Sequence, residues 1–196
     1  MNFRRSVLCI GGLDPSGGAG LSVDAAAVRS LELHPALVCA LNTVQNGERF
    51  FSARPCPAKD VAAAMNAILS VQRVAAFKTG ALGRAGIVRA VARTVKANPE
   101  IPLVVDPVLK SSSSGSLADK DAIDVMMAEL FPLATLVTPN LDEAERITGI
   151  AVRTPAEMLK AAHIILARGP RAVLIKGGHL PGDRLVDMLV LKGGHV

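Results

Sequence analysis

The chain contains no tryptophan and no tyrosine, and aromatic residues make up only 3% of its 196 positions. Proteins that bind single-stranded nucleic acid stack bases on exposed aromatic rings, and this chain offers five phenylalanines at most. Its net charge is +5, but the 22 lysines and arginines are scattered along the sequence. We therefore expect no nucleic-acid partner, and we interpret the basic surface as suited to small anionic metabolites.

Cysteine is also scarce, with Cys9, Cys39 and Cys56 as the three examples. None of them forms a CxxC pair or any other spacing typical of metal ligands. Apolar runs are too short to span a membrane, and the apolar stretch near the N-terminus is too short for a signal peptide. These features predict reduced thiols, no membrane partner and a cytoplasmic location.

Two common phosphate-binding motifs are missing, namely GxxxxGK[ST] and the GxGxxG of dinucleotide folds. A glycine-rich segment does occupy residues 11–26, but it carries the acids Asp14 and Asp24. A loop that only cradled phosphates would avoid such negative charge. Asp24 lies in the first turns of an expected helix, where it either accepts hydrogen bonds from a ligand or interacts with the helix dipole.

Apolar strand patterns alternate with amphipathic helix patterns along the whole chain. Strands are predicted at 6–10, 36–42, 48–56, 74–80, 101–107, 134–140 and 172–178, with a possible further strand at 184–191. Helices are predicted at 20–34, 58–71, 85–98, 117–131, 141–149 and 154–169. This alternation predicts one α/β domain over residues 1–196, with a mostly parallel central sheet and helices on both faces.

Polar segments follow six of the expected strands. They read GGLDPSGGAG, NTVQNG, KTGALG, DPVLKSSSSG, TPNLDE and KGGH. Ligands of open parallel sheets bind beyond the carboxyl ends of the strands, so we expect one site along this edge. The serine-rich stretch 111–115 is either an ordinary flexible loop or, because it directly follows a strand-end acid, a flap over the ligand. The second KGGH, at 192–195, is interpreted as a coincidental repeat.

Three charged residues among these segments fit phosphate chemistry. Asp106 ends one strand and Glu143 follows the TPN tripeptide, so the two carboxylates could together hold a hydrated Mg²⁺ ion. A helix-capping role is the alternative for either acid. Lys176 ends an apolar strand before two glycines, where it either reaches phosphate oxygens or remains an ordinary surface lysine.

The motifs GLDPSGGAGLSVDAAAV, TVQNG, FKTGALG, VVDPV, TPNLDEA and VLIKGGH resemble, in order and spacing, those of bacterial hydroxymethylpyrimidine and phosphomethylpyrimidine kinases. The resemblance covers nearly the whole chain. It implies a ribokinase-like three-layer fold and a role in thiamine biosynthesis. It also implies transfer of the γ-phosphoryl group of ATP, with Mg²⁺, to 4-amino-5-hydroxymethyl-2-methylpyrimidine and then to its monophosphate. Members of this family tend to form homodimers.

The resemblance further implies roles for individual residues. The acceptor ring is expected to contact Gly12, Asp24, Gln45, Ala81 and Val108. Lys176 and Asp106 are the expected catalytic residues, Lys176 and Asn140 are expected to bind ATP, and Asp106 and Glu143 are expected to hold the metal.

Two departures from the family pattern keep other functions open. Ala81 stands where family members often have methionine, which would widen the acceptor pocket and suits a pyridoxal or pyridoxine kinase. The family's GTGC or GTGD motif has no counterpart before Val196, so we expect the chain to be C-terminally incomplete relative to the family. A pyrimidine-binding relative without catalytic activity is the remaining alternative.

Overall fold

Strands and helices alternate in the computed structural model, which describes residues 5–46, 48–110, 117–178 and 185–195. In chain order the strands are β1 (Ser6–Leu13), β2 (His34–Gln45), β3 (Phe50–Pro55), β4 (Val74–Thr79), β5 (Leu103–Val105), β6 (Leu136–Val137), β7 (Ala172–Ile175), β8 (Met188–Leu191) and β9 (Gly194–His195). The α-helices are α1 (Gly20–Ser30), α2 (Ala58–Leu69), α3 (Ala85–Lys96), α4 (Lys120–Val125), α5 (Leu141–Thr148) and α6 (Pro155–Leu166). A π-helical turn, η1 (Met126–Leu130), and a 3₁₀ turn, η2 (Phe131–Leu133), follow α4.

The described strands form one sheet in the order β3-β2-β1-β4-β5-β6-β7-β8-β9. The strands from β2 to β7 in this order pair in parallel, whereas β3, β8 and β9 add antiparallel edges. The mostly parallel α/β fold predicted from the sequence is therefore confirmed.

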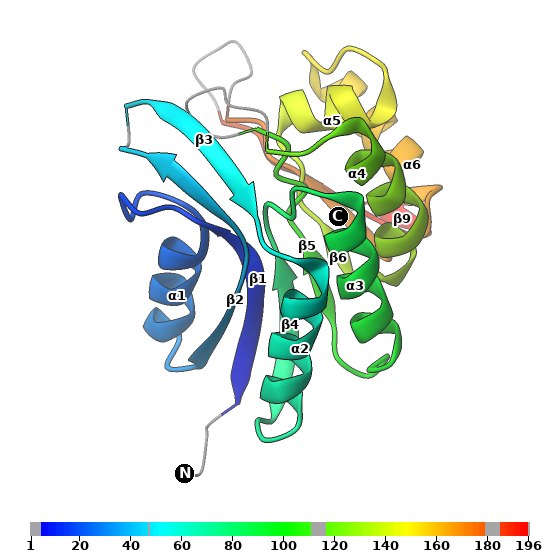
Figure 1. The fold of residues 1–196 in the computed structure, drawn as a ribbon. Coiled ribbons are helices and arrows are strands. Elements are labelled where there is room, and N and C mark those ends of the chain that lie inside the picture. Colours follow the sequence, from blue (N-terminus) through cyan, green and yellow to red (C-terminus); the bar gives the residue numbers. More distant parts are fainter. Residues whose placement is uncertain (1–4, 47, 111–116, 179–184, 196) are drawn as a thin grey trace.

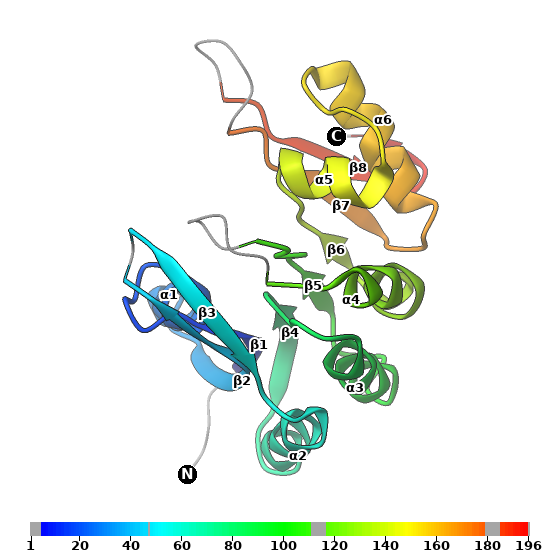
Figure 2. The same cartoon turned by 45° about the horizontal axis from the view of Figure 1, so that its top comes forward.

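Helices cover the two faces of this sheet unequally. Helix α1 packs alone on one face over β1 and β2, while the other helices line the opposite face (Figures 1 and 2). Leu21 and Val28 of α1 pack on Cys9 of β1 in a small core. A larger core, which includes Phe77 and Phe131, lies between the sheet and the remaining helices. Among the described residues, no helix has the length and apolar character required to cross a bilayer.

Several predicted boundaries were wrong. Strand β2 extends to Gln45 because it pairs antiparallel with β3, so the segment expected to be a strand-end loop is instead one arm of a hairpin. Helix α1 stops at Ser30, and Glu32 adopts a positive φ of 58° in the turn to β2. The helix expected over 117–131 is a short α-helix that widens into the π-helical turn.

The two KGGH copies have different structures. In the first, Lys176 directly follows β7, and the second forms the turn and strand of the β8–β9 hairpin. Gly193 in that turn has a φ of +99°, which suits glycine. The expected serine-rich flap at 111–115 lies outside the described residues.

The order in which successive strands join the sheet reverses between the parallel strands β1 and β4. From β1 the connection through α1 leads to β2 on one side, and from β4 the connection through α3 leads to β5 on the other. Loops at the carboxyl ends of β1 and β4 therefore diverge and leave a crevice, the usual ligand position in open α/β sheets.

Candidate functional site

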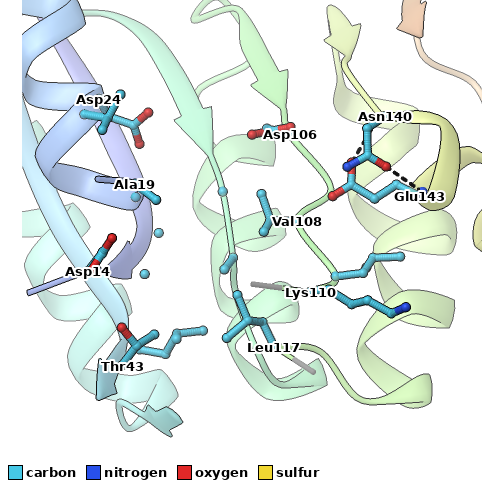
Figure 3. Close-up of a pocket in the computed structure, with 18 of the residues that line it drawn as sticks. Asp14, Ala19, Asp24, Thr43, Asp106, Val108, Lys110, Leu117, Asn140 and Glu143 are labelled. Carbon is cyan, nitrogen blue, oxygen red and sulfur yellow. Dashed lines mark hydrogen bonds between the residues drawn. The ribbon is translucent and has the colours of Figure 1, made fainter. Parts of the chain in front are cut away.

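A cavity of about 540 Å³ opens at this crevice, a size typical of small-molecule sites. Its lining comes from the loop after β1, helix α1, the residues after β4 and β5, the start of α5 and the residue after β7. In Figure 3, Asp14, Ala19, Asp24 and Thr43 lie on one side, and Asp106, Asn140 and Glu143 lie on the other. We call these sides, after the roles that the sequence predicts for them, the acceptor half and the phosphate half.

The glycine-rich loop folds back on β1 to shape the acceptor half. The carboxylate of Asp14 accepts hydrogen bonds from the backbone N–H and the hydroxyl of Ser16, at 2.8 and 2.7 Å. Burial raises the pKa of Asp14, but hydrogen bonds from Ser16, Gln45 and Ala19 outweigh it, and the pKa lies below its ordinary value. Gly20 has a φ of +61°, and a Cβ there would collide with the Gly12 carbonyl. Only glycine fits this close approach.

Asp24 of α1 points across the cavity to a lysine. The ammonium of Lys78 in β4 donates to both carboxylate oxygens of Asp24, at 2.8 and 3.0 Å. It also lies 3.9 Å from Oδ2 of Asp106. Both side chains of the Asp24–Lys78 pair are largely but not fully buried.

Asp106, just after β5, connects this pair to the phosphate half. Its Oδ1 accepts a hydrogen bond from Nζ of Lys176 at 2.9 Å. The backbone N–H of Lys176 donates to the carbonyl of Pro139, which places Lys176 beside Asn140. Four side chains of alternating charge, Asp24, Lys78, Asp106 and Lys176, thus run from one half of the cavity to the other.

Asn140 and Glu143 begin helix α5 and cap it reciprocally. The Asn140 side chain accepts from the Glu143 backbone N–H at 2.8 Å, and Glu143 accepts from the Asn140 backbone N–H at 2.9 Å. Burial, reinforced by the negative charge of Asp106, raises the pKa of Glu143 to about 7. The capping alternative considered for Glu143 is therefore present in the structure, and it does not prevent the carboxylate from lining the cavity.

The acids of the phosphate half suit a magnesium ion better than a metal whose ligands all come from protein side chains. Among the described residues, no group of three or more histidine, cysteine, aspartate or glutamate side chains is arranged to hold a metal. Mg²⁺ is commonly bound by only one or two carboxylates, with waters and substrate phosphates completing its shell. The mutual repulsion of Asp106 and Glu143 is what a bound cation would relieve.

Eight of the nine residues singled out in the sequence line this cavity. They are Gly12, Asp24, Ala81, Asp106, Val108, Asn140, Glu143 and Lys176. Gln45 is not among the described lining residues; it sits at the end of β2 and reaches the site through Asp14. Lys78 was missed, although a charged residue inside the otherwise apolar run VAAFKTG was a signal for it.

Comparison with known proteins gives consistent matches. The model of the phosphomethylpyrimidine kinase family matches residues 14–196. A hydroxymethylpyrimidine/phosphomethylpyrimidine kinase of Streptomyces coelicolor is 39% identical over 183 residues, which are 93% of this chain and 67% of that protein. The chain thus spans about two thirds of the length of this relative.

Solved structures agree with the sequence match. The crystal structure of phosphomethylpyrimidine kinase from Clostridium difficile superposes with a TM-score of 0.87 at 34% identity, covering 97% of this chain and 82% of that one. Pyridoxal kinase from Staphylococcus aureus in complex with AMP-PCP and pyridoxal has a TM-score of 0.85 at 29% identity, covering 96% of this chain and 68% of that one.

Proposed function

The chain belongs to the phosphomethylpyrimidine kinase family, and on this basis we propose that it binds 4-amino-5-hydroxymethyl-2-methylpyrimidine and ATP. The reaction is transfer of the γ-phosphoryl group to the hydroxymethyl oxygen, followed by a second transfer to the monophosphate. Because the chain spans about two thirds of the length of the Streptomyces coelicolor relative, the activity of the whole protein is part of this proposal.

The observation that carries the proposal is the charge series from Asp24 to Lys176 within one cavity. A kinase for a flat heterocycle needs, within one cavity, a carboxylate for the ring amine and a cation for the transferred phosphoryl group. Asp24 supplies the first and Lys176 the second. Val108 lies between the two halves, where it offers an apolar wall to a ring (Figure 3).

The residues act by positioning rather than by covalent chemistry, since phosphoryl transfer depends mainly on alignment and charge neutralisation. Asp24 orients the ring so that its hydroxymethyl group faces the phosphate half. Lys176, held by Asp106, lies where negative charge grows on the transferred group. The acceptor hydroxyl oxygen bonds to the γ-phosphorus as the bond between that phosphorus and the β–γ bridging oxygen breaks. The hydroxyl proton passes to solvent water, and ADP departs.

Asp106 and Glu143 would hold Mg²⁺, and Asn140 beside Lys176 would contact the nucleotide. When bound, the ion supplies charge neutralisation to the ATP phosphates. Burial and the nearby charge of Asp106 raise the pKa of Glu143, and a bound cation would offset both effects.

A pyridoxal kinase is the second candidate, and Ala81 favours it. This buried residue lines the acceptor half, and its small side chain leaves room for a ring with a bulkier set of substituents. The similarity to a pyridoxal kinase structure supports the same candidate.

A coupled assay of ADP release tests the proposal, with hydroxymethylpyrimidine and pyridoxal offered separately to the protein with ATP and magnesium. We expect hydroxymethylpyrimidine to give the higher kcat/KM, and the variant Ala81→Met to lower activity with pyridoxal more than with the pyrimidine. A higher kcat/KM with pyridoxal would establish the second candidate. If neither hydroxymethylpyrimidine nor pyridoxal stimulates ADP release, and calorimetry detects binding of neither ring, both candidate functions are rejected. We also propose that the protein forms a homodimer, so analytical ultracentrifugation should give the mass of two chains; the mass of one chain would reject the dimer.

A further inference from the structure

Lys78 lies between the two halves of the cavity, and the reaction described so far assigns it no role. It belongs to β4, a central strand with parallel neighbours on both sides. Such strands are normally apolar, because both of their faces are buried. A lysine at this position costs desolvation, which indicates that its charge serves the site.

The surroundings of Lys78 leave its ammonium open to the cavity. A Cβ on Gly80 would lie only 3.3 Å from Nζ, so the glycine makes room for the charged group. The Lys78 side chain is 24% exposed and lines the cavity. Nζ of Lys78 makes two short contacts with the Asp24 carboxylate, at 2.8 and 3.0 Å. Its third contact, with Oδ2 of Asp106, is longer at 3.9 Å.

A phosphorylated acceptor meets an electrostatic problem in this cavity. A phosphate monoester carries close to two negative charges near neutral pH. With its ring in the acceptor half, the phosphate would lie between the carboxylates of Asp24 and Asp106. Among the described residues that line the cavity, Lys78 is the one cation that contacts both of them. Lys176 contacts the other oxygen of Asp106, farther into the phosphate half.

We propose that Lys78 is a specificity-determining residue that admits a phosphorylated pyrimidine to the acceptor half. This inference rests on the proposed kinase function. The ammonium keeps its short contacts with Asp24 and exchanges the long contact with Asp106 for a phosphate oxygen. A bond then forms between an oxygen of the acceptor's phosphate and the γ-phosphorus of ATP, while the bond to the β–γ bridging oxygen breaks and ADP leaves. The attacking oxygen is already deprotonated, so no proton has to be removed.

The test is the ratio of two dissociation constants measured by calorimetry, that of the monophosphate divided by that of hydroxymethylpyrimidine. Any effect on ring binding is shared by both ligands and cancels in this ratio. We expect Lys78→Met to raise the ratio at least about tenfold, the loss of a charge-assisted contact. Lys78→Arg should keep it within about threefold of the unmodified protein. Lys110→Met is the matched control, since Lys110 lines the cavity away from Asp24 (Figure 3), and it should leave the ratio unchanged.

A second variant tests the same electrostatics without altering Lys78. Asp24→Asn removes one charge that repels the phosphate and frees the Lys78 ammonium from its ion pair. It should therefore lower the ratio of the two dissociation constants, even though it weakens the binding of both ligands. If circular dichroism shows that Lys78→Met does not fold, the result for Asp24→Asn tests the proposal on its own. An unchanged ratio in Lys78→Met, an unchanged or raised ratio in Asp24→Asn, or a larger effect in Lys110→Met would overturn the assignment. If the unmodified protein binds neither pyrimidine, the proposed function itself fails.

Discussion

The side chains of Asn140 and Glu143 each accept a hydrogen bond from the other's backbone N–H, at 2.8 and 2.9 Å. This reciprocal cap fixes the first turn of α5 at the edge of the cavity. It also holds the Glu143 carboxylate, which is only 6% exposed, beside Asp106. Glu143 therefore both helps to cap a helix and places its carboxyl group in the phosphate half.

This arrangement predicts a pH-dependent stability. The pKa of Glu143 is about 7 in the folded protein, above the ordinary glutamate value of 4.5, so the folded state binds the proton more tightly. The stability that this proton confers is fully present below about pH 4.5 and is lost as the pH rises through 7. Glu143→Gln preserves the cap without the charge. It should be more stable than the unmodified protein by about 3 kcal/mol at pH 8 and almost equally stable near pH 4.5.

Urea unfolding followed by circular dichroism, with EDTA present, measures this difference. Glu129→Gln is the control, because Glu129 is exposed in an ion pair with Arg89 and should show no such pH-dependent gain. Equal stabilities of Glu143→Gln and the unmodified protein at pH 8 would show that the charged Glu143 carboxylate does not destabilise the folded state.

The second prediction concerns the backbone of the glycine-rich loop. Gly20 combines a φ of +61° with a close approach to the Gly12 carbonyl, so Gly20→Ala should lower the free energy of unfolding by at least about 2 kcal/mol. Gly18 is a matched control in the same loop, since the nearest atoms to a Cβ there are 3.7 Å away. Gly18→Ala should change stability by less than about 0.5 kcal/mol. Similar losses in the two variants would show that this contact does not shape the loop.

The third prediction concerns Asp24. Asp24→Asn should weaken binding of hydroxymethylpyrimidine by about 1.5–3 kcal/mol, because a charge-assisted hydrogen bond to the ring is lost. Asp124→Asn, at an exposed position on α4, is the control and should bind the pyrimidine normally. Calorimetry of the two variants side by side makes the comparison, and normal binding by Asp24→Asn would exclude its carboxylate from ring recognition.

Gln45 leads to a fourth prediction, in which the residue acts at the edge of the site. Its hydrogen bond to Asp14 links the β2–β3 hairpin to the glycine-rich loop. Gln45→Ala should weaken pyrimidine binding by about 1–3 kcal/mol and leave ATP binding almost unchanged. If fluorescence or calorimetric titration gives the same pyrimidine affinity as the unmodified protein, Gln45 is no part of the site.

The position of the site could be predicted from the sequence for a simple geometric reason. Parallel strands end at one edge of a sheet, so acids and lysines that follow different strands converge there. Asp106 and Lys176 are 70 positions apart in sequence, yet Nζ of Lys176 lies 2.9 Å from Oδ1 of Asp106 in the structure. The pattern of short apolar runs and polar strand ends was sufficient for this result.

Other features depend on contacts that the local sequence does not encode. The length of β2, and with it the position of Gln45, is set by pairing with β3. Lys78 is visible in the sequence as a charge inside an apolar strand, but its contact with Asp24 of α1 is evident only in the structure. The dual role of Glu143 follows from its burial, which a list of acids cannot show.

The most direct test of the divided cavity is a crossed titration of two variants with two ligands. Asp24→Asn should weaken hydroxymethylpyrimidine binding at least about tenfold and leave the affinity for ATP within about twofold. Lys176→Met should weaken ATP binding at least about tenfold and leave the affinity for hydroxymethylpyrimidine within about twofold. A phosphate contact is lost in this variant, while the acceptor half remains intact. If each variant weakens both ligands equally, or if neither weakens its own ligand, the cavity does not hold the acceptor and the phosphates in separate halves.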